Sequence, residues 1–184
     1  GIVDATRQAG LEGRTVFVLH PHQTRYVVPA RSVSVLPDHV PPPRAVLAAN
    51  LETAINGVWD ARPHVGDRVT VIGAGAVGCL VAWIVGRMAG CDVELVDVNP
   101  QRAPVAHALG VRFAEPAAAR ADADVVIHAS GSPSGLALAL RVAAFEATIV
   151  EMSWYGDQEV PMALGEGFHA RRLTLTSSQV GHVA

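Results

Sequence analysis

Residues 71–97 read VIGAGAVGCLVAWIVGRMAGCDVELVD, and this stretch decides the fold. An apolar run from Val69 to Ile72 predicts a strand, which leads into three glycines spaced as Gly73-x-Gly75-x-x-Gly78. The first glycine permits a tight turn, the second leaves the backbone bare, and the third lets a following helix pack closely on the strand. A purely structural glycine-rich turn can have the same spacing, so the glycines alone do not identify a ligand.

The residues that follow make the prediction more specific. The apolar segment from Ala76 to about Met88 predicts a helix, whose free N-terminal N–H groups and positive dipole end suit a phosphate. A second strand, Val93 to Val96, ends at Asp97, which lies 19 residues after Gly78. A carboxylate at that distance is placed to meet the hydroxyls of an adenosine ribose. The stretch therefore predicts a dinucleotide site.

Strands continue to alternate with helices towards the C-terminus. This order predicts an α/β fold with a doubly wound, mainly parallel sheet, in which ligands bind at the carboxyl ends of the strands. The further strands are expected at 111–113, 124–129, 147–152 and 173–176, with helices at 101–109 and 133–144 and a brief helical patch at 117–120.

The first 43 residues have a different texture. Short β-like runs at 15–19, 25–28 and 32–36 are separated by polar or proline-containing turns. Three prolines at 41–43 close this zone, and a helix is expected over 45–60. We therefore expect two parts, residues 1–43 and residues 44–184.

Composition limits the classes of partner. Half of the 184 residues are hydrophobic and 17% are charged, which is typical of a globular chain. The net charge of −3 gives no electrostatic case for binding nucleic acid or an anionic membrane. The uncharged run 71–86 is shorter than the ~20 residues that span a bilayer. Two cysteines, Cys79 and Cys91, fit a reducing compartment, and the N-terminus has no secretory signal, so we expect a cytoplasmic protein.

Four segments resemble the medium-chain dehydrogenase/reductase family, the zinc-type alcohol dehydrogenase relatives. They are YVVPARSVSVLPDHVP at 26–41, VGDRVTVIGAGAVG at 65–78, VVIHASGSP at 125–133 and FHARRLTLTSSQVG at 168–181. The resemblance implies a Rossmann sheet that binds NAD, preceded by a short β segment of a GroES-like catalytic domain. It also implies hydride transfer between a nicotinamide and an alcohol or carbonyl carbon, with chemistry that the cofactor supplies.

The resemblance further implies where the cofactor lies. Asp97 takes the ribose hydroxyls, and its charge repels a 2′-phosphate, so NAD is favoured over NADP; Arg102 softens that preference or is simply a solvated helix charge. The residues implied at the pyrophosphate are Gly73, Gly75, Ala76, Val77 and Gly78; those near the ribose are Asp97, Val98, Asn99 and Arg102; those towards the nicotinamide are Ser130, Gly131 and Ser153.

Zinc is implied only for an intact protein. Glu52 stands where polyol dehydrogenase relatives have a glutamate ligand, but a catalytic zinc needs about three protein ligands, and a solvated or paired helix carboxylate is the favoured explanation of Glu52. The family's Cys and Gly-His-Glu motifs and its four-cysteine lobe do not occur in this chain. It looks like a fragment that binds cofactor without turnover. The strand at 173–176 is implied to pair with a second copy in a homodimer.

Two other functions remain open. A methyltransferase that uses S-adenosylmethionine also has a glycine-rich first loop and an acid after its second strand, although the two-residue gap before Gly78 argues against it. A nucleotide-binding module without catalysis is the other alternative. His128 lies in the strand expected at 124–129. We expect a hydrogen-bonded core histidine there rather than a catalytic base.

Overall fold

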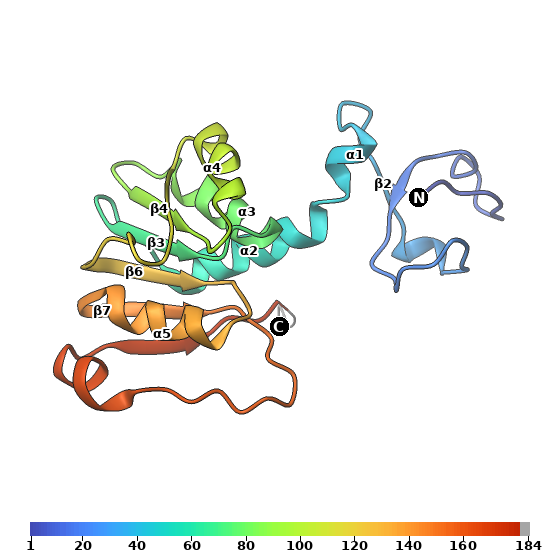
Figure 1. Cartoon of the computed structure of the whole chain (residues 1–184). Coiled ribbons are helices and arrows are strands. Elements are labelled where there is room, and N and C mark those ends of the chain that lie inside the picture. The colour runs from blue at the N-terminus through green and yellow to red at the C-terminus, as the bar shows by residue number, and fades with distance from the viewer. Residues whose placement is uncertain (181–184) are drawn as a thin grey trace. The chain divides into compact units, whose positions relative to one another are not determined.

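The computed structural model describes residues 1–180 (Figure 1). Contacts within the chain divide it into two compact units, Gly1–Ala49 and a second one that begins at Asn50. The division expected after residue 43 stays a prediction.

The first unit contains little regular structure. Strand β1 (Val16–Phe17) pairs antiparallel with β2 (Ser34–Val35), and the other elements are a 3-10 turn, η1 (Ala30–Ser32), and a short helix, α1 (Pro42–Ala45). The strand expected at 25–28 is wrong: these residues form no ladder, and the Val27 side chain is 98% exposed. Isolated extended residues gain nothing without a partner strand that pairs their backbone and covers their side chains.

The prolines at 41–43 were expected to end the first part of the chain. In the structure they also begin a helix, because Pro41 is the N-cap residue of α1. Pro42 and Pro43 occupy the first turn of α1, where an N–H would have no partner in the helix. The helix expected over 45–60 is α2 (Ala48–Ala61), which begins three residues later than expected and follows the separate helix α1.

A six-stranded sheet, parallel throughout, forms the second unit, with the strand order β5-β4-β3-β6-β7-β8. This confirms the predicted doubly wound α/β fold. Four central strands are almost continuously apolar because helices cover both faces of the sheet. The strands are β3 (Arg68–Ile72), β4 (Asp92–Val96), β5 (Arg112–Ala114), β6 (Ala123–His128), β7 (Ala143–Glu151) and β8 (Thr174–Ser177).

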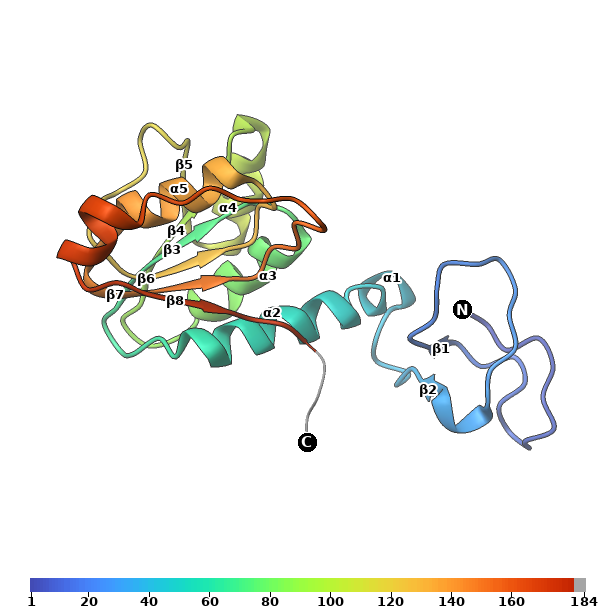
Figure 2. The same ribbon diagram turned by 90° about the horizontal axis from the view of Figure 1, so that it is seen from below.

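Helices pack on the two faces separately, as Figure 2 shows. Side chains of α2, α3 and α4 pack with Val71, Leu95 and Ile127 on one face, and side chains of α5 pack with Val126 and Ile149 on the other. The helical elements of this unit are α2, α3 (Ala76–Val85), η2 (Pro100–Arg102), α4 (Ala103–Leu109), α5 (Pro133–Val142) and η3 (Leu164–His169).

Two details differ from the sequence expectation. Strand β7 begins at Ala143, four residues early, and its pairing with β6 is irregular between Ala123 and Val125. The helical patch expected at 117–120 is wrong: it is a single turn, after which the Arg120 N–H donates to the side chain of Glu94. No helix within residues 1–180 is both long enough and apolar enough to cross a membrane.

Candidate functional site

The glycine turn lies at the carboxyl end of β3 and is held on both sides. Gly73 has a φ of +108°, and its N–H donates to the carbonyl of Val96 at the end of β4. A Cβ on Gly73 would lie 2.8 Å from the backbone of Ser130, which follows β6. A Cβ on Gly78 would lie 1.8 Å from the Gly73 carbonyl oxygen. Both glycines are therefore required by close backbone packing.

Gly75 differs from its two neighbours. It is exposed, it is the N-cap residue of α3, and a Cβ built on it would meet nothing within 4 Å. No side chain caps the helix, and the first helical bond in the turn runs from the Cys79 N–H to the Gly75 carbonyl. The N–H groups of residues 76–78 thus have no intrahelical partner and carry the positive end of the helix dipole. This open, electropositive backbone fits a diphosphate.

Asp97 faces this turn from the end of β4. One carboxylate oxygen accepts a hydrogen bond of 2.6 Å from the N–H of Ala74, and the other accepts one of 2.8 Å from the N–H of Asn99. A carboxylate has about four acceptor positions, so about two remain for hydroxyl groups of a ligand. The side chain is half-buried, and the two backbone bonds fix its orientation.

The prediction also placed three further residues near the ribose, namely Val98, Asn99 and Arg102. Val98 is 77% exposed, and the Asn99 side chain caps η2 by accepting a hydrogen bond from the N–H of Gln101. Arg102 is exposed and lies near enough to Cys79 to lower the pKa of that thiol, although burial raises the pKa more. The Arg102 guanidinium is thus on the side of the glycine turn.

Ser130, Gly131 and Ser153 come together across the ends of β6 and β7. The Gly131 N–H donates to the Ser153 hydroxyl oxygen at 3.0 Å, and Ser130 touches the glycine turn through its backbone. Every residue predicted at the cofactor therefore lies on the carboxyl edge of the sheet, at the ends of β3, β4, β6 and β7. Contact with a ligand stays a prediction for each of them.

Sequence reasoning expected a hydrogen-bonded core histidine at His128 but missed its partners, which connect it to these serines. The imidazole of His128 is fully buried between the carboxylate of Glu151, at 2.7 Å, and the hydroxyl of Ser130, at 2.6 Å. The Tyr155 hydroxyl donates to the same carboxylate at 3.1 Å. The signal was present in the sequence, because a histidine and a glutamate each end an otherwise apolar run, but the register that aligns His128 with Glu151 follows only from the sheet.

Glu52 was predicted as a zinc ligand of the intact protein. It is an exposed residue of α2, and residues 1–180 contain no group of three or more histidine, cysteine, aspartate or glutamate side chains that could hold a metal ion. The residues present therefore do not fit a zinc site.

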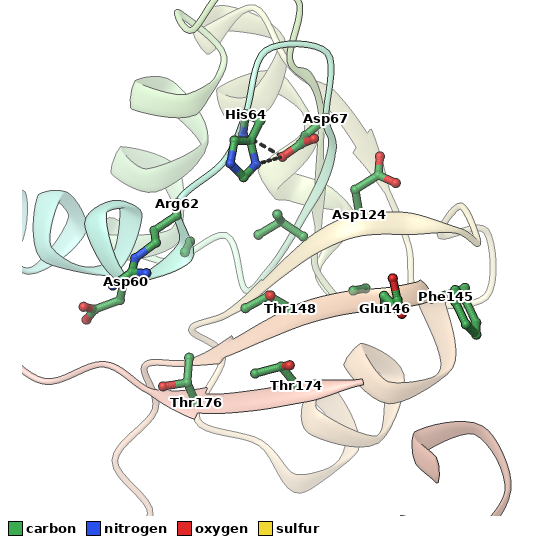
Figure 3. Close-up of a pocket in the computed structure, with 13 residues that line it drawn as sticks. Asp60, Arg62, His64, Asp67, Asp124, Phe145, Glu146, Thr148, Thr174 and Thr176 are labelled. Carbon is green, nitrogen blue, oxygen red and sulfur yellow. Dashed lines mark hydrogen bonds and ion pairs between the residues drawn. The ribbon is translucent and has the colours of Figure 1, made fainter. Parts of the chain in front are cut away.

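A cavity of about 630 Å³ lies at the opposite, amino edge of the sheet (Figure 3). Several of its polar side chains have partners: the Asp67 carboxylate accepts from the His64 N–H, and Asp124 is paired with Arg68. No buried side-chain N or O atom within the described part of the chain lacks a hydrogen-bond partner. Only its volume thus suggests a ligand site in this cavity, whereas the carboxyl edge has backbone N–H groups that are open to a ligand. Its lining includes Asp60, His64, Asp124, Glu146, Thr148 and Thr174.

Comparisons with known proteins match the part of the chain that forms the sheet. A family model described as ketopantoate reductase PanE/ApbA matches residues 69–140. A zinc-type alcohol dehydrogenase-like protein of Haemophilus influenzae is 30% identical over 139 residues, which cover 68% of this chain and 40% of that protein. An L-threonine 3-dehydrogenase of Rhizobium rhizogenes is 33% identical over 54% of this chain and 28% of its own length. The chain thus spans well under half the length of these curated relatives.

Solved structures show the same fold. The alcohol dehydrogenase rspB of E. coli CFT073, complexed with NADH, superposes with a TM-score of 0.72 at 22% identity over 83% of this chain and 48% of that one. A zinc-binding dehydrogenase of Sinorhizobium meliloti, bound to NADP, gives 0.71 at 21% identity over 82% and 48%. By sequence and by fold, this chain is therefore related to the cofactor-binding half of zinc-type alcohol dehydrogenase-like proteins of the medium-chain dehydrogenase/reductase family.

Proposed function

We propose that this chain binds NAD(H) at the carboxyl edge of its sheet, as the cofactor-binding part of an oxidoreductase that acts on an alcohol or carbonyl. The observation that carries the proposal is the bare, exposed Gly75 at the start of α3 with the Asp97 carboxylate bonded to the same turn. Residues 1–43 would belong to a GroES-like catalytic part and residues 44–184 to the NAD-binding domain.

Each group at this edge has a definite task in that proposal. The N–H groups of residues 76–78 bind the diphosphate, and Asp97 orients the adenosine ribose. The bound nicotinamide supplies the hydride acceptor or donor. Ser130, Gly131 and Ser153 hold its half of the dinucleotide over the ends of β6 and β7.

Preference for NAD over NADP follows from charge. A 2′-phosphate would be placed against the Asp97 carboxylate, whose oxygens already accept two backbone N–H groups and cannot easily turn away. Arg102 supplies the nearby positive charge that would reduce this repulsion. NADH binds more tightly than NADPH, by a margin that Arg102 limits.

Substrate turnover requires parts that the described residues do not supply. The relatives are dehydrogenases at least twice as long as the matched region, and residues 1–180 hold no metal-binding group. We expect this chain to bind cofactor without turnover. The intact protein would bind a small alcohol or carbonyl substrate, and any zinc at Glu52 would also belong to the intact protein. The two half-buried thiols, Cys79 and Cys91, are free and suit the reducing cytoplasm.

A homodimer is proposed at the β8 edge of the sheet. Thr174–Ser177 is the last strand in the order and pairs with β7 on one side only. A strand with one unpaired side is a template for a second copy related by a two-fold axis. Sedimentation as a monomer at high concentration would contradict this part of the proposal.

Fluorescence titration tests the main proposal directly. The Trp154 side chain is 85% exposed next to Ser153, so bound NADH would quench tryptophan emission and accept its energy. We expect saturable binding of NADH, weaker binding of NADPH and no binding of S-adenosylmethionine. Saturable S-adenosylmethionine binding without NADH binding would replace the dehydrogenase interpretation with a methyltransferase-like one.

A further inference from the structure

The buried imidazole of His128 connects the ends of β6 and β7. Its Nδ1 is 2.7 Å from the Glu151 carboxylate, and its Nε2 is 2.6 Å from the Ser130 hydroxyl. The histidine side chain is fully buried, whereas Ser130 is exposed at the carboxyl edge. An interior group therefore contacts a surface hydroxyl beside the glycine turn.

The first turn of α5 packs directly on this pair. A Cβ on Gly135 would lie 2.3 Å from the Ser130 hydroxyl oxygen and 2.4 Å from Nε2 of His128. Neither group can swing towards the helix, because it would meet the backbone there. The hydrogen bond between Ser130 and His128 is thus enclosed on the helix side.

The surrounding groups determine where the protons lie. Burial raises the pKa of Glu151, but hydrogen bonds from His128 and Ser153 and the attraction of the imidazole outweigh it, so the pKa falls below its ordinary value and the group is a carboxylate at neutral pH. Burial and the charge of Glu151 raise the pKa of Tyr155 to about 12, so the phenol keeps its proton. Nδ1 of His128 can contact this carboxylate only as a donor.

The Ser130 hydroxyl is held from two sides. Its oxygen is 2.6 Å from Nε2 of His128; the hydroxyl donates in this bond when the imidazole is neutral and accepts when the imidazole is protonated. The same oxygen accepts from the N–H of Ser132 at 3.3 Å.

Ser153 is held by hydrogen bonds within the protein. Its oxygen accepts from the N–H of Gly131, and Nδ1 of His128 lies 3.3 Å away. The Ser153 side chain also bonds the Glu151 carboxylate and helps to lower the pKa of that group.

A serine, histidine and carboxylate in this sequence of contacts also resembles a nucleophile with its base. Such chemistry needs backbone N–H donors for an oxyanion close to the serine. The N–H groups of Gly131 and Ser132, which follow Ser130, donate instead to the hydroxyl oxygens of Ser153 and Ser130. The arrangement is therefore suited to orienting hydroxyl groups and not to acyl transfer.

We propose that His128, supported by Glu151, is a positioning residue that holds the Ser130 hydroxyl at the carboxyl edge for the nicotinamide half of the dinucleotide. The ligand chemistry is a group that forms a hydrogen bond with a hydroxyl, as the ribose hydroxyls and the carboxamide do. This inference depends on the proposed NAD(H) binding and adds the residue that controls one of its two halves.

The test compares NADH with ADP, which lacks the nicotinamide half. Ser130→Ala should weaken NADH binding about 3- to 10-fold, the usual value of one hydrogen bond, and leave ADP binding unchanged. His128→Asn keeps a donor for Glu151 but has no atom at Nε2, so it should cause a similar loss. Ser134→Ala is the matched control, because Ser134 pairs only with the Ser132 hydroxyl.

A double-mutant cycle separates positioning from a structural role. If His128 acts through Ser130, adding His128→Asn to Ser130→Ala should cause little further loss of NADH affinity. Additive losses, or equal losses for NADH and ADP, would overturn the inference. Should His128→Asn not fold, unchanged NADH binding by Ser130→Ala would overturn it instead. Failure of the unaltered chain to bind NADH would remove the proposed function and this inference together.

Discussion

The two ends of one sheet are built from different chemistry. At the amino edge, charged side chains pair with each other: Arg68 with Asp124, and Arg120 with both Asp92 and the fully buried Glu94. At the carboxyl edge, two carboxylates accept backbone N–H groups, and the start of α3 leaves N–H groups without partners. The difference shows that charged side chains at the amino edge satisfy one another, whereas the open backbone turn at the carboxyl edge has N–H groups that a ligand can bind.

The same contrast explains why cavity volume is a poor guide here. In the amino-edge cavity of Figure 3, the carboxylates of Asp67, Asp124 and Glu146 already have partners. Substitutions at the amino edge should therefore change stability, and substitutions at the carboxyl edge should change binding. The predictions below test that division, from the largest expected effect to the smallest.

Gly78→Ala should have the largest effect because it changes both the stability of the fold and the binding of NADH. Its Cβ would meet the Gly73 carbonyl oxygen at 1.8 Å. The oxygen is a backbone atom and the Cβ is fixed to the backbone, so neither can move without moving the chain. We expect a loss of about 3 kcal/mol or more in the free energy of unfolding, with loss of NADH binding. Urea denaturation measures it, and an unchanged transition midpoint would show that α3 can move away from β3.

Arg120→Ala tests the amino edge alone. It removes one cation from Glu94, which keeps Arg112 at 3.4 Å and the backbone N–H of Arg120. We expect a loss of about 2 kcal/mol in the free energy of unfolding, because a fully buried carboxylate is left partly compensated. The NADH dissociation constant of the folded protein should stay the same, and a large rise in it would break the division between the two edges.

Asp97→Asn tests the carboxyl edge with little change in shape. The amide oxygen can replace one carboxylate oxygen, but the NH₂ group cannot accept from the N–H of Ala74 or Asn99. We expect NADH binding to weaken about 10-fold and the preference for NADH over NADPH to shrink. Titration of both cofactors measures the ratio; a ratio equal to that of the unaltered chain would remove Asp97 from the ribose site.

The smallest effect is a pH dependence from Glu151. Its pKa in the folded chain lies below the ordinary 4.5, so the unfolded chain binds more protons in that range. The stabilisation is present above pH 4.5 and is lost as the pH falls through the folded value. Asp92 and Asp124 at the amino edge change stability in the same direction, since hydrogen bonds from Arg120 and Arg68 lower their pKa values.

Glu151→Gln isolates its share of this pH dependence. Thermal unfolding at a series of pH values should show a shallower fall for the variant than for the unaltered chain below pH 4.5. Parallel curves would mean that the amino-edge carboxylates account for the whole dependence.

Sequence patterns predicted the second unit well because its signals are local. The glycine spacing, the apolar runs and Asp97 all act within a few residues of the turn, and the order of strands follows from the alternation of strands and helices. The strand expected at 25–28 failed because it depended on a partner that the pattern could not supply. The patch at 117–120 failed because Arg120 contacts Glu94, which lies 26 residues earlier.

The network of His128 and Glu151 could not be predicted for the same reason. It depends on the register of β6 against β7, and an irregularity between Ala123 and Val125 shifts that register. The sequence analysis expected a hydrogen-bonded core histidine, and the structure shows one. Its partners depend on the pairing of strands that are distant in the chain.

The most direct test of the central claim is NADH titration of Gly75→Ala beside Arg120→Ala. A Cβ on Gly75 meets nothing in the protein, so only a diphosphate lying on the turn would sense it. We predict that Gly75→Ala unfolds at the same temperature as the unaltered chain but binds NADH at least about 10-fold more weakly, a loss of about 1.4 kcal/mol, while Arg120→Ala shows the reverse. Equal NADH binding by Gly75→Ala and the unaltered chain would contradict a diphosphate at this turn.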